Sequence, residues 1–89
     1  MIDIKIPAVW RPMTGASRVT LQAETVAAAL QALVKRYPQL QAQLFNDKQE
    51  VNEGLNLFLN DEHIRYRGGW DAPLHDGDEL YIVPLITGG

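Results

Sequence analysis

The most reactive group that this sequence offers is a carboxylate at the end of its own chain. Gly88 and Gly89 are the last two residues, and Pro84 lies shortly before them. Because proline has no N–H to donate, we expect the final strand to weaken at Pro84 and residues 85–89 to form a flexible, extended tail. Two glycines can enter a channel that is too narrow for branched residues. The sequence therefore predicts a carboxylate on a mobile arm, which an ATP-using partner could activate as an acyl donor.

The other side chains that could do chemistry form no catalytic or metal-binding pattern. His63 and His75 do not have the spacing of metal ligands. The acidic residues Asp76 and Asp78 flank a glycine without the rest of a calcium loop, which is typical of a turn. The sequence has no cysteine, which excludes disulfides, a thiol nucleophile and Cys-ligated metals. We therefore expect no catalytic residue, no metal site and no bound cofactor, and we do not expect an enzyme.

The composition is that of one globular domain. The chain has 89 residues, of which 46% are hydrophobic, enough for one modest core. Its net charge is −3 and its eight basic residues are scattered, which argues against nucleic acid as a partner. The longest apolar run, residues 81–86, is far shorter than the ~20 residues that span a bilayer. Asp3 and Lys5 interrupt the region where a signal peptide is apolar, so we expect a cytoplasmic protein without a membrane segment.

Two strands and a helix are predicted in the N-terminal half. Isoleucines alternate with polar residues over 2–6, and alternation resumes over 18–22, which predicts a hairpin around a loop at 10–16. Thr25 is a typical helix N-cap, and apolar residues then recur at helical spacing. We expect the main helix to run from Val26 to Tyr37.

Further strands are predicted in the C-terminal half. Leucines alternate with other residues over 55–59, a short strand is possible at 64–66, and residues 76–78 turn the chain into a final strand. A strand that follows a helix can return beside the first strand. The result is an α+β domain over residues 1–84, with one main helix on one face of a mixed four- to five-stranded sheet. The other face is open unless a partner covers it.

Strand periodicity separates the expected core from the open face. The residues expected to be buried are Ile4, Leu21, Leu30, Leu33, Leu57 and Ile82. The same periodicity places Phe58, Tyr81 and Val83 on the open face, where a contiguous apolar patch would mark a partner-binding site. Trp10 and Trp70 fit two roles equally, as binding anchors or as partial cover for the core.

The closing segment also resembles a known family ending. It contains Asp76-Gly77-Asp78-Glu79-Leu80, Val83-Pro84 and Ile86-Thr87-Gly88-Gly89. These segments resemble the DGDEV…FPPVTGG ending of the ThiS/MoaD sulfur-carrier family, prokaryotic relatives of ubiquitin. Leu85 departs from this ending, which has a second proline there, and the glycines stay in place. The order of two strands and a capped helix also fits the family, so the resemblance covers the whole domain and implies the β-grasp fold.

Two loop segments resemble the carriers that serve cysteine biosynthesis. Arg11-Pro12-Met13-Thr14-Gly15 resembles their RPHTG motif. Asn60-Asp61-Glu62-His63-Ile64-Arg65-Tyr66, followed by Gly68-Gly69, resembles their NDEDVRF-x-GG motif. Within the family, the sequence is therefore most similar to the cysteine-biosynthesis carriers.

The resemblance implies a cycle of activation and sulfur transfer at Gly88-Gly89. An E1-like adenylating enzyme would use ATP on the Gly89 carboxylate, and sulfur transfer would then give a thiocarboxylate, a 1-thioglycine at Gly89. A biosynthetic enzyme would accept the sulfur; it would be cysteine-synthase-like, or else belong to a molybdopterin or thiamine pathway. The residues expected to contact these partners are Phe58, Tyr81, Val83 and Thr87.

Two other functions fit the same residues. The chain could be a ubiquitin-like modifier that is joined through Gly89 to lysines of target proteins, because that reaction also begins with adenylation. It could instead be a non-covalent binding module in which the terminal glycines have no chemical role.

Overall fold

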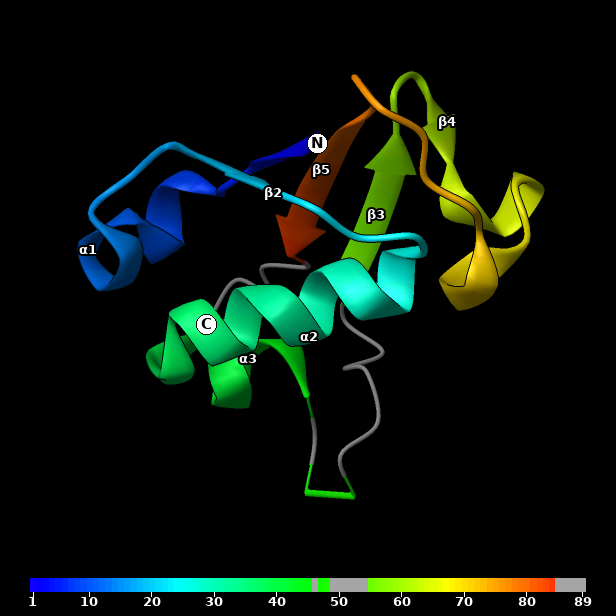
Figure 1. The fold of residues 1–89 in the computed structure, drawn as a ribbon. Helices are drawn as coiled ribbons and strands as arrows, with labels where there is room; N and C mark the ends of the chain where they lie inside the picture. The colour runs from blue at the N-terminus through cyan, green and yellow to red at the C-terminus, as the bar shows by residue number, and fades with distance from the viewer. Residues whose placement is uncertain (46, 49–54, 85–89) are drawn as a thin grey trace.

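Five strands form one mixed sheet in the computed structural model, which describes residues 1–45, 47–48 and 55–84 (Figure 1). The strands are β1 (Ile2–Lys5), β2 (Arg18–Leu21), β3 (Leu55–Leu59), β4 (Glu62–His63) and β5 (Glu79–Pro84). Their order across the sheet is β2-β1-β5-β3-β4. β1 pairs in parallel with β5, and the other three pairings are antiparallel. The predicted hairpin, mixed sheet and return beside the first strand are confirmed.

The principal helix, α2 (Val26–Arg36), packs across one face of this sheet (Figure 1). Its N-cap is the predicted one, because the Thr25 hydroxyl oxygen accepts a hydrogen bond from the Ala28 N–H at 3.1 Å. The helix ends one residue earlier than expected. Tyr37 precedes a proline and adopts φ −128° and ψ 81°, outside the helical region.

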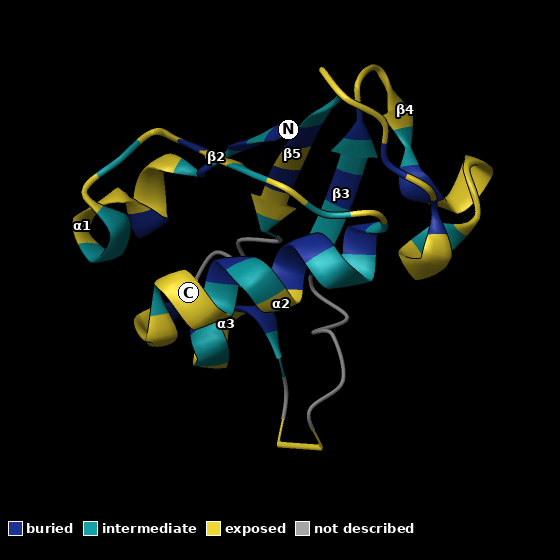
Figure 2. Ribbon diagram, in the orientation of Figure 1, coloured by how far each residue is buried: buried dark blue, intermediate teal, exposed yellow. Residues whose placement is uncertain are grey.

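The core lies between α2 and the strands. Figure 2 shows buried and more exposed residues alternating along β5, as a half-buried strand requires. Five of the six residues expected to be buried are 4% exposed or less: Ile4, Leu30, Leu33, Leu57 and Ile82. The expectation for Leu21 is wrong. Leu21 is only partly buried, because it is the last residue of β2, an edge strand of the sheet.

The region predicted as a loop at 10–16 is largely helical instead. A 3₁₀ turn, η1 (Ala8–Trp10), leads into α1 (Arg11–Thr14). Pro12 occupies the first turn, where its missing N–H is not needed, and Gly15 ends the helix in the left-handed region at φ 71°. This arrangement turns Trp10 into the core, where it is 4% exposed. Of its two possible roles, Trp10 therefore has that of core cover.

The prediction of a short strand at 64–66 is also wrong. The tight turn after β3 leads directly into β4, and Ile64–Tyr66 form a 3₁₀ turn, η3. The His63 side chain caps this turn by accepting a hydrogen bond from the Arg65 N–H at 3.1 Å, and Ile64 is buried. The remaining short elements are η2 (Pro38–Leu40), α3 (Gln41–Leu44) and η4 (Gly69–Asp71). None of the helices in the described part of the chain has the length and apolar character needed to cross a membrane.

Candidate functional site

One side chain from each of the five strands lines up across the sheet face that α2 leaves uncovered. The register pairs Arg18 with Lys5, Lys5 with Tyr81, Tyr81 with Phe58, and Phe58 with His63. We call these five residues the sheet-face row. The row is basic over β2 and β1 and becomes aromatic over β5 and β3. The open face predicted from strand periodicity is therefore confirmed.

The apolar part of this face consists of the three residues that the sequence indicates. Phe58 and Tyr81 are direct cross-strand partners, and Val83 is the next outward-facing residue of β5. Tyr81 is 37% exposed and Val83 is 46% exposed. The Phe58 ring is less accessible, because the His63 ring packs edge-on against it at a centroid distance of 5.2 Å. The three residues form one contiguous but small apolar surface.

The terminal residues of the predicted site lie outside the described part of the chain. Thr87, Gly88 and Gly89 belong to this group, so the flexible tail at 85–89 stays a prediction. Trp70 lies on η4, is 37% exposed and does not belong to the sheet-face row.

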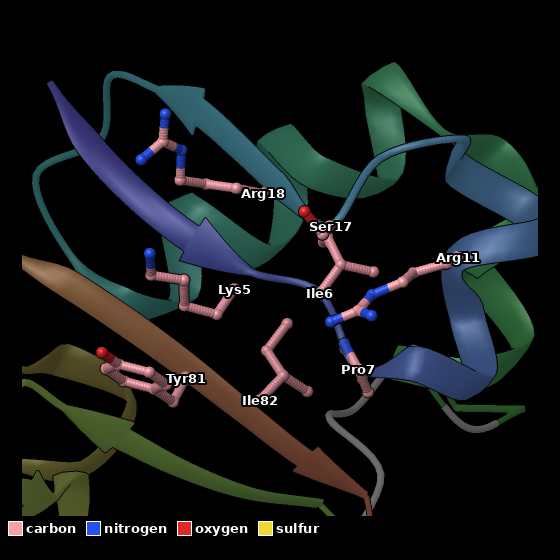
Figure 3. A pocket seen from close by; sticks show the side chains of 8 residues that line it. All are labelled: Lys5, Ile6, Pro7, Arg11, Ser17, Arg18, Tyr81 and Ile82. Carbon is pink, nitrogen blue, oxygen red and sulfur yellow. The ribbon is translucent and has the colours of Figure 1, made fainter.

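A basic hollow at one end of the open face was not predicted. It has a volume of about 630 Å³ and lies where the end of β1, the start of β2, helix α1 and β5 meet (Figure 3). Lys5, Arg11 and Arg18 contribute its three cations. Strand periodicity indicates that Lys5 and Arg18 lie on the same open face as Tyr81, but only the strand pairing shows that they are neighbours. Arg11 gave no such signal, because helix α1 was interpreted as a loop.

The turn that leads into β5 is held by the Asp78 carboxylate. This carboxylate accepts hydrogen bonds from the His75 backbone N–H at 2.8 Å and from the Asn60 side-chain amide at 3.2 Å. Gly77 provides the left-handed residue of the turn at φ 90°. Desolvation raises the pKa of Asp78, but these two hydrogen bonds and the charges of His75 and Arg67 outweigh it, so the pKa lies below its ordinary value.

Replacing Asp78 with Ala should therefore destabilise the fold in a pH-dependent way. The loss of two charge-assisted hydrogen bonds at an exposed turn should cost about 1–2 kcal/mol near neutral pH. Because the folded pKa is depressed, this stabilisation is fully present above the unfolded value of about 3.9 and is lost as pH falls through the folded pKa. Urea unfolding of both proteins from pH 7 to pH 2 measures the difference. A gap that stays constant down to pH 2 would contradict this assignment.

The described part of the chain contains no cluster of potential metal ligands. No group of three or more His, Asp or Glu side chains gathers there in a way that could hold a metal ion. No polar or charged side chain of the described residues is buried either.

Comparison with known proteins places these features in a family. The sequence model of the ThiS family matches residues 4–89. The chain belongs to the ThiS family. The match includes the open face and the terminal glycines, so the resemblance stated from the sequence motifs is confirmed.

Two individual relatives are similar over most or nearly all of the chain. The sulfur carrier protein CysO of Mycobacterium tuberculosis is 29% identical over 91 residues, covering 99% of this chain and 98% of the relative. Small archaeal modifier protein 1 of Haloferax volcanii is 35% identical over 65 residues, covering 73% of this chain and 70% of the relative. These relatives are named as a sulfur carrier and as a modifier protein, and the first name supports the general role of a sulfur carrier.

Solved structures agree with the fold and with the family. A chain in the crystal structure of the Amycolatopsis orientalis BexX/CysO complex superposes with a TM-score of 0.87 at 30% identity, covering all of both chains. The crystal structure of Haloferax volcanii SAMP1 gives a TM-score of 0.81 at 30% identity, covering 99% of this chain and 98% of the other. The predicted β-grasp fold is therefore confirmed.

Proposed function

We propose that this protein is a sulfur carrier whose Gly89 carboxylate is adenylated and then converted to a thiocarboxylate. The observation that supports this most strongly is the similarity to CysO over 99% of the chain, together with a family match that extends through Gly89. CysO is named as a sulfur carrier, and a carboxylate that follows two residues without side chains is the group on this chain best suited to that role.

The chemistry of the cycle follows from the carboxylate. Its oxygen attacks the α-phosphorus of ATP on an activating enzyme, and pyrophosphate leaves. A hydrosulfide ion then attacks the acyl carbon and AMP leaves, so that one carboxyl oxygen is replaced by sulfur. The thiocarboxylate sulfur finally displaces a leaving group from an electrophilic substrate on an accepting enzyme, and hydrolysis of the acyl–sulfur bond of the resulting thioester leaves the sulfur on the substrate and restores the Gly89 carboxylate. In this cycle the partner enzymes supply the acids and bases, and the carrier supplies only the carboxylate.

The partners proposed for this cycle are an E1-like activating enzyme and a cysteine-synthase-like acceptor. The similarity to the sulfur carrier CysO supports a sulfur-accepting partner in general. The cysteine-synthase-like kind is proposed from the resemblance of the two loop motifs to those of the cysteine-biosynthesis carriers. The BexX/CysO complex shows that a CysO protein with the same fold assembles with another protein. The surface of this chain best suited to docking the activating enzyme is the one around Phe58, Tyr81 and Val83, because it is apolar, exposed and continuous.

A second function, protein modification, is favoured by one observation. The 35% identity to small archaeal modifier protein 1 connects this chain to proteins named for modifying others. A modifier would use the same activated Gly89 but transfer it to a lysine amine. The product would then be an amide-linked conjugate instead of a free thiocarboxylate.

The two functions are separated by the fate of Gly89 in native protein. We expect protein purified from its own cells to show the mass increase of one sulfur replacing one oxygen. This increase should disappear when the accepting enzyme and its substrate are added. Intact-mass spectrometry measures the exchange, and blotting under denaturing, reducing conditions detects conjugates. Abundant lysine-linked conjugates without any thiocarboxylate would replace the carrier function with the modifier function.

A further inference from the structure

The basic hollow lies at the β2–β1 end of the sheet-face row, and its charged lining residues are all basic. Three of the eight basic residues of the chain line it, and no Asp or Glu does. In Figure 3 the Arg11 side chain extends from α1 towards Ile6 and Pro7. The chain as a whole carries a net charge of −3. The fold therefore gathers positive charge at one place on an acidic protein.

The two arginines of this hollow lack charge partners within the described residues. Lys5 pairs with the Glu79 carboxylate at 3.2 Å, so its charge is partly balanced. Arg11 and Arg18 are exposed, and neither guanidinium group forms a hydrogen bond or an ion pair with any residue that the structure describes. A guanidinium group presents a planar set of donors that matches a carboxylate in a two-point contact. Both groups are thus available to an external anion.

The hollow is continuous with the apolar part of the open face. Tyr81 belongs to both, and Lys5 is its direct neighbour across the β1–β5 pairing. A protein that covers Tyr81 and Val83 would therefore also cover the edge of the hollow. Burying a guanidinium without a partner costs several kcal/mol, whereas burying it against a carboxylate offsets most of that cost.

We infer that the protein docking on this face presents Asp or Glu side chains to Arg11 and Arg18. The inference rests on the proposed function, because it takes the activating enzyme as the protein that docks there. The surface complementary to this chain then has an apolar centre opposite Tyr81 and Val83 and an acidic edge opposite the hollow. A small free anion is a poorer occupant, because the described residues provide no buried polar side chain to hold it.

Charge reversal at the two arginines tests this inference. The double variant Arg11→Glu/Arg18→Glu should raise the KM for the carrier at least about tenfold in ATP–pyrophosphate exchange with the activating enzyme of the same cells at low salt. The kcat and the thermal midpoint should stay close to those of the wild type. The difference in KM should shrink at high ionic strength, because salt screens exposed charges.

Lys35→Glu provides the matched control, with the same reversal of charge at one site. Lys35 is exposed in the last turn of α2, which packs on the opposite face of the sheet. The KM of the Lys35→Glu variant should stay within about twofold of the wild-type value. If the single variants Arg11→Glu and Arg18→Glu and the double variant shift KM no more than Lys35→Glu does, the inference is wrong. Saturable binding of inorganic phosphate at the hollow, lost in the double variant, would assign the hollow to a small anion instead.

Failure of this inference is distinguishable from failure of the proposed function. Wild-type protein that supports no ATP–pyrophosphate exchange would overturn the proposed function itself. Normal exchange by the wild type and by the arginine variants would overturn only the inference that the partner presents an acidic edge to the hollow.

Discussion

Deleting Gly89 is expected to abolish ATP–pyrophosphate exchange with the activating enzyme while leaving the thermal midpoint unchanged. After the deletion the terminal carboxylate belongs to Gly88. It lies about 3.3 Å short of the position that the Gly89 carboxylate would occupy in the activating enzyme. A glycine has no side chain to bury, so its loss removes nothing from the core that the described residues form up to Ile82.

A bulky residue at the neighbouring position tests the same site by sterics alone. Gly88→Phe keeps the Gly89 carboxylate but should also abolish exchange, because a channel fitted to glycine cannot admit a ring. Gly88→Ala is the graded control and should retain part of the activity. Normal exchange by the Gly89 deletion would show that adenylation does not occur at this terminus.

Placing a charge on the open face is expected to give the second large effect. Val83→Asp should lower kcat/KM for adenylation by about 30-fold, equivalent to about 2 kcal/mol of lost binding at an interface centre. Val83 is 46% exposed and lies opposite Asn56, so a charge there stays hydrated in the free protein. The thermal midpoint should therefore fall by no more than about 5 °C.

The control for this variant is a more exposed hydrophobic residue away from the sheet-face row. Tyr66 lies on η3 and is 70% exposed, the most accessible of the large hydrophobic residues described. Tyr66→Asp should leave adenylation kinetics near those of the wild type. Unchanged kinetics for Val83→Asp would show that the activating enzyme docks elsewhere, whatever the outcome at Gly89.

Local patterns in the sequence determined the parts of this protein that depend on near neighbours. The helix from Val26 was predictable because its cap and its apolar spacing act within a few residues. The open-face position of Phe58, Tyr81 and Val83 was predictable because successive side chains of a strand point to opposite faces. The motif at Gly88-Gly89 likewise indicated the family from sequence alone.

Only the tertiary structure decided which of these local pieces meet. The helical turn at Arg11 was missed because proline and glycine are typical of loops as well as of the ends of short helices. The 3₁₀ turn at 64–66 replaced a strand because the His63 side chain caps it and Ile64 is buried. Arg11 and Arg18 are seven positions apart in sequence, on different elements, and they line one hollow only because β1 pairs with β2 and with β5 at the same time. Pairing between distant strands depends on the packing of the whole core, so strand periodicity indicates the face on which Lys5, Arg18 and Tyr81 lie, but their assembly with Arg11 could not be predicted from the sequence.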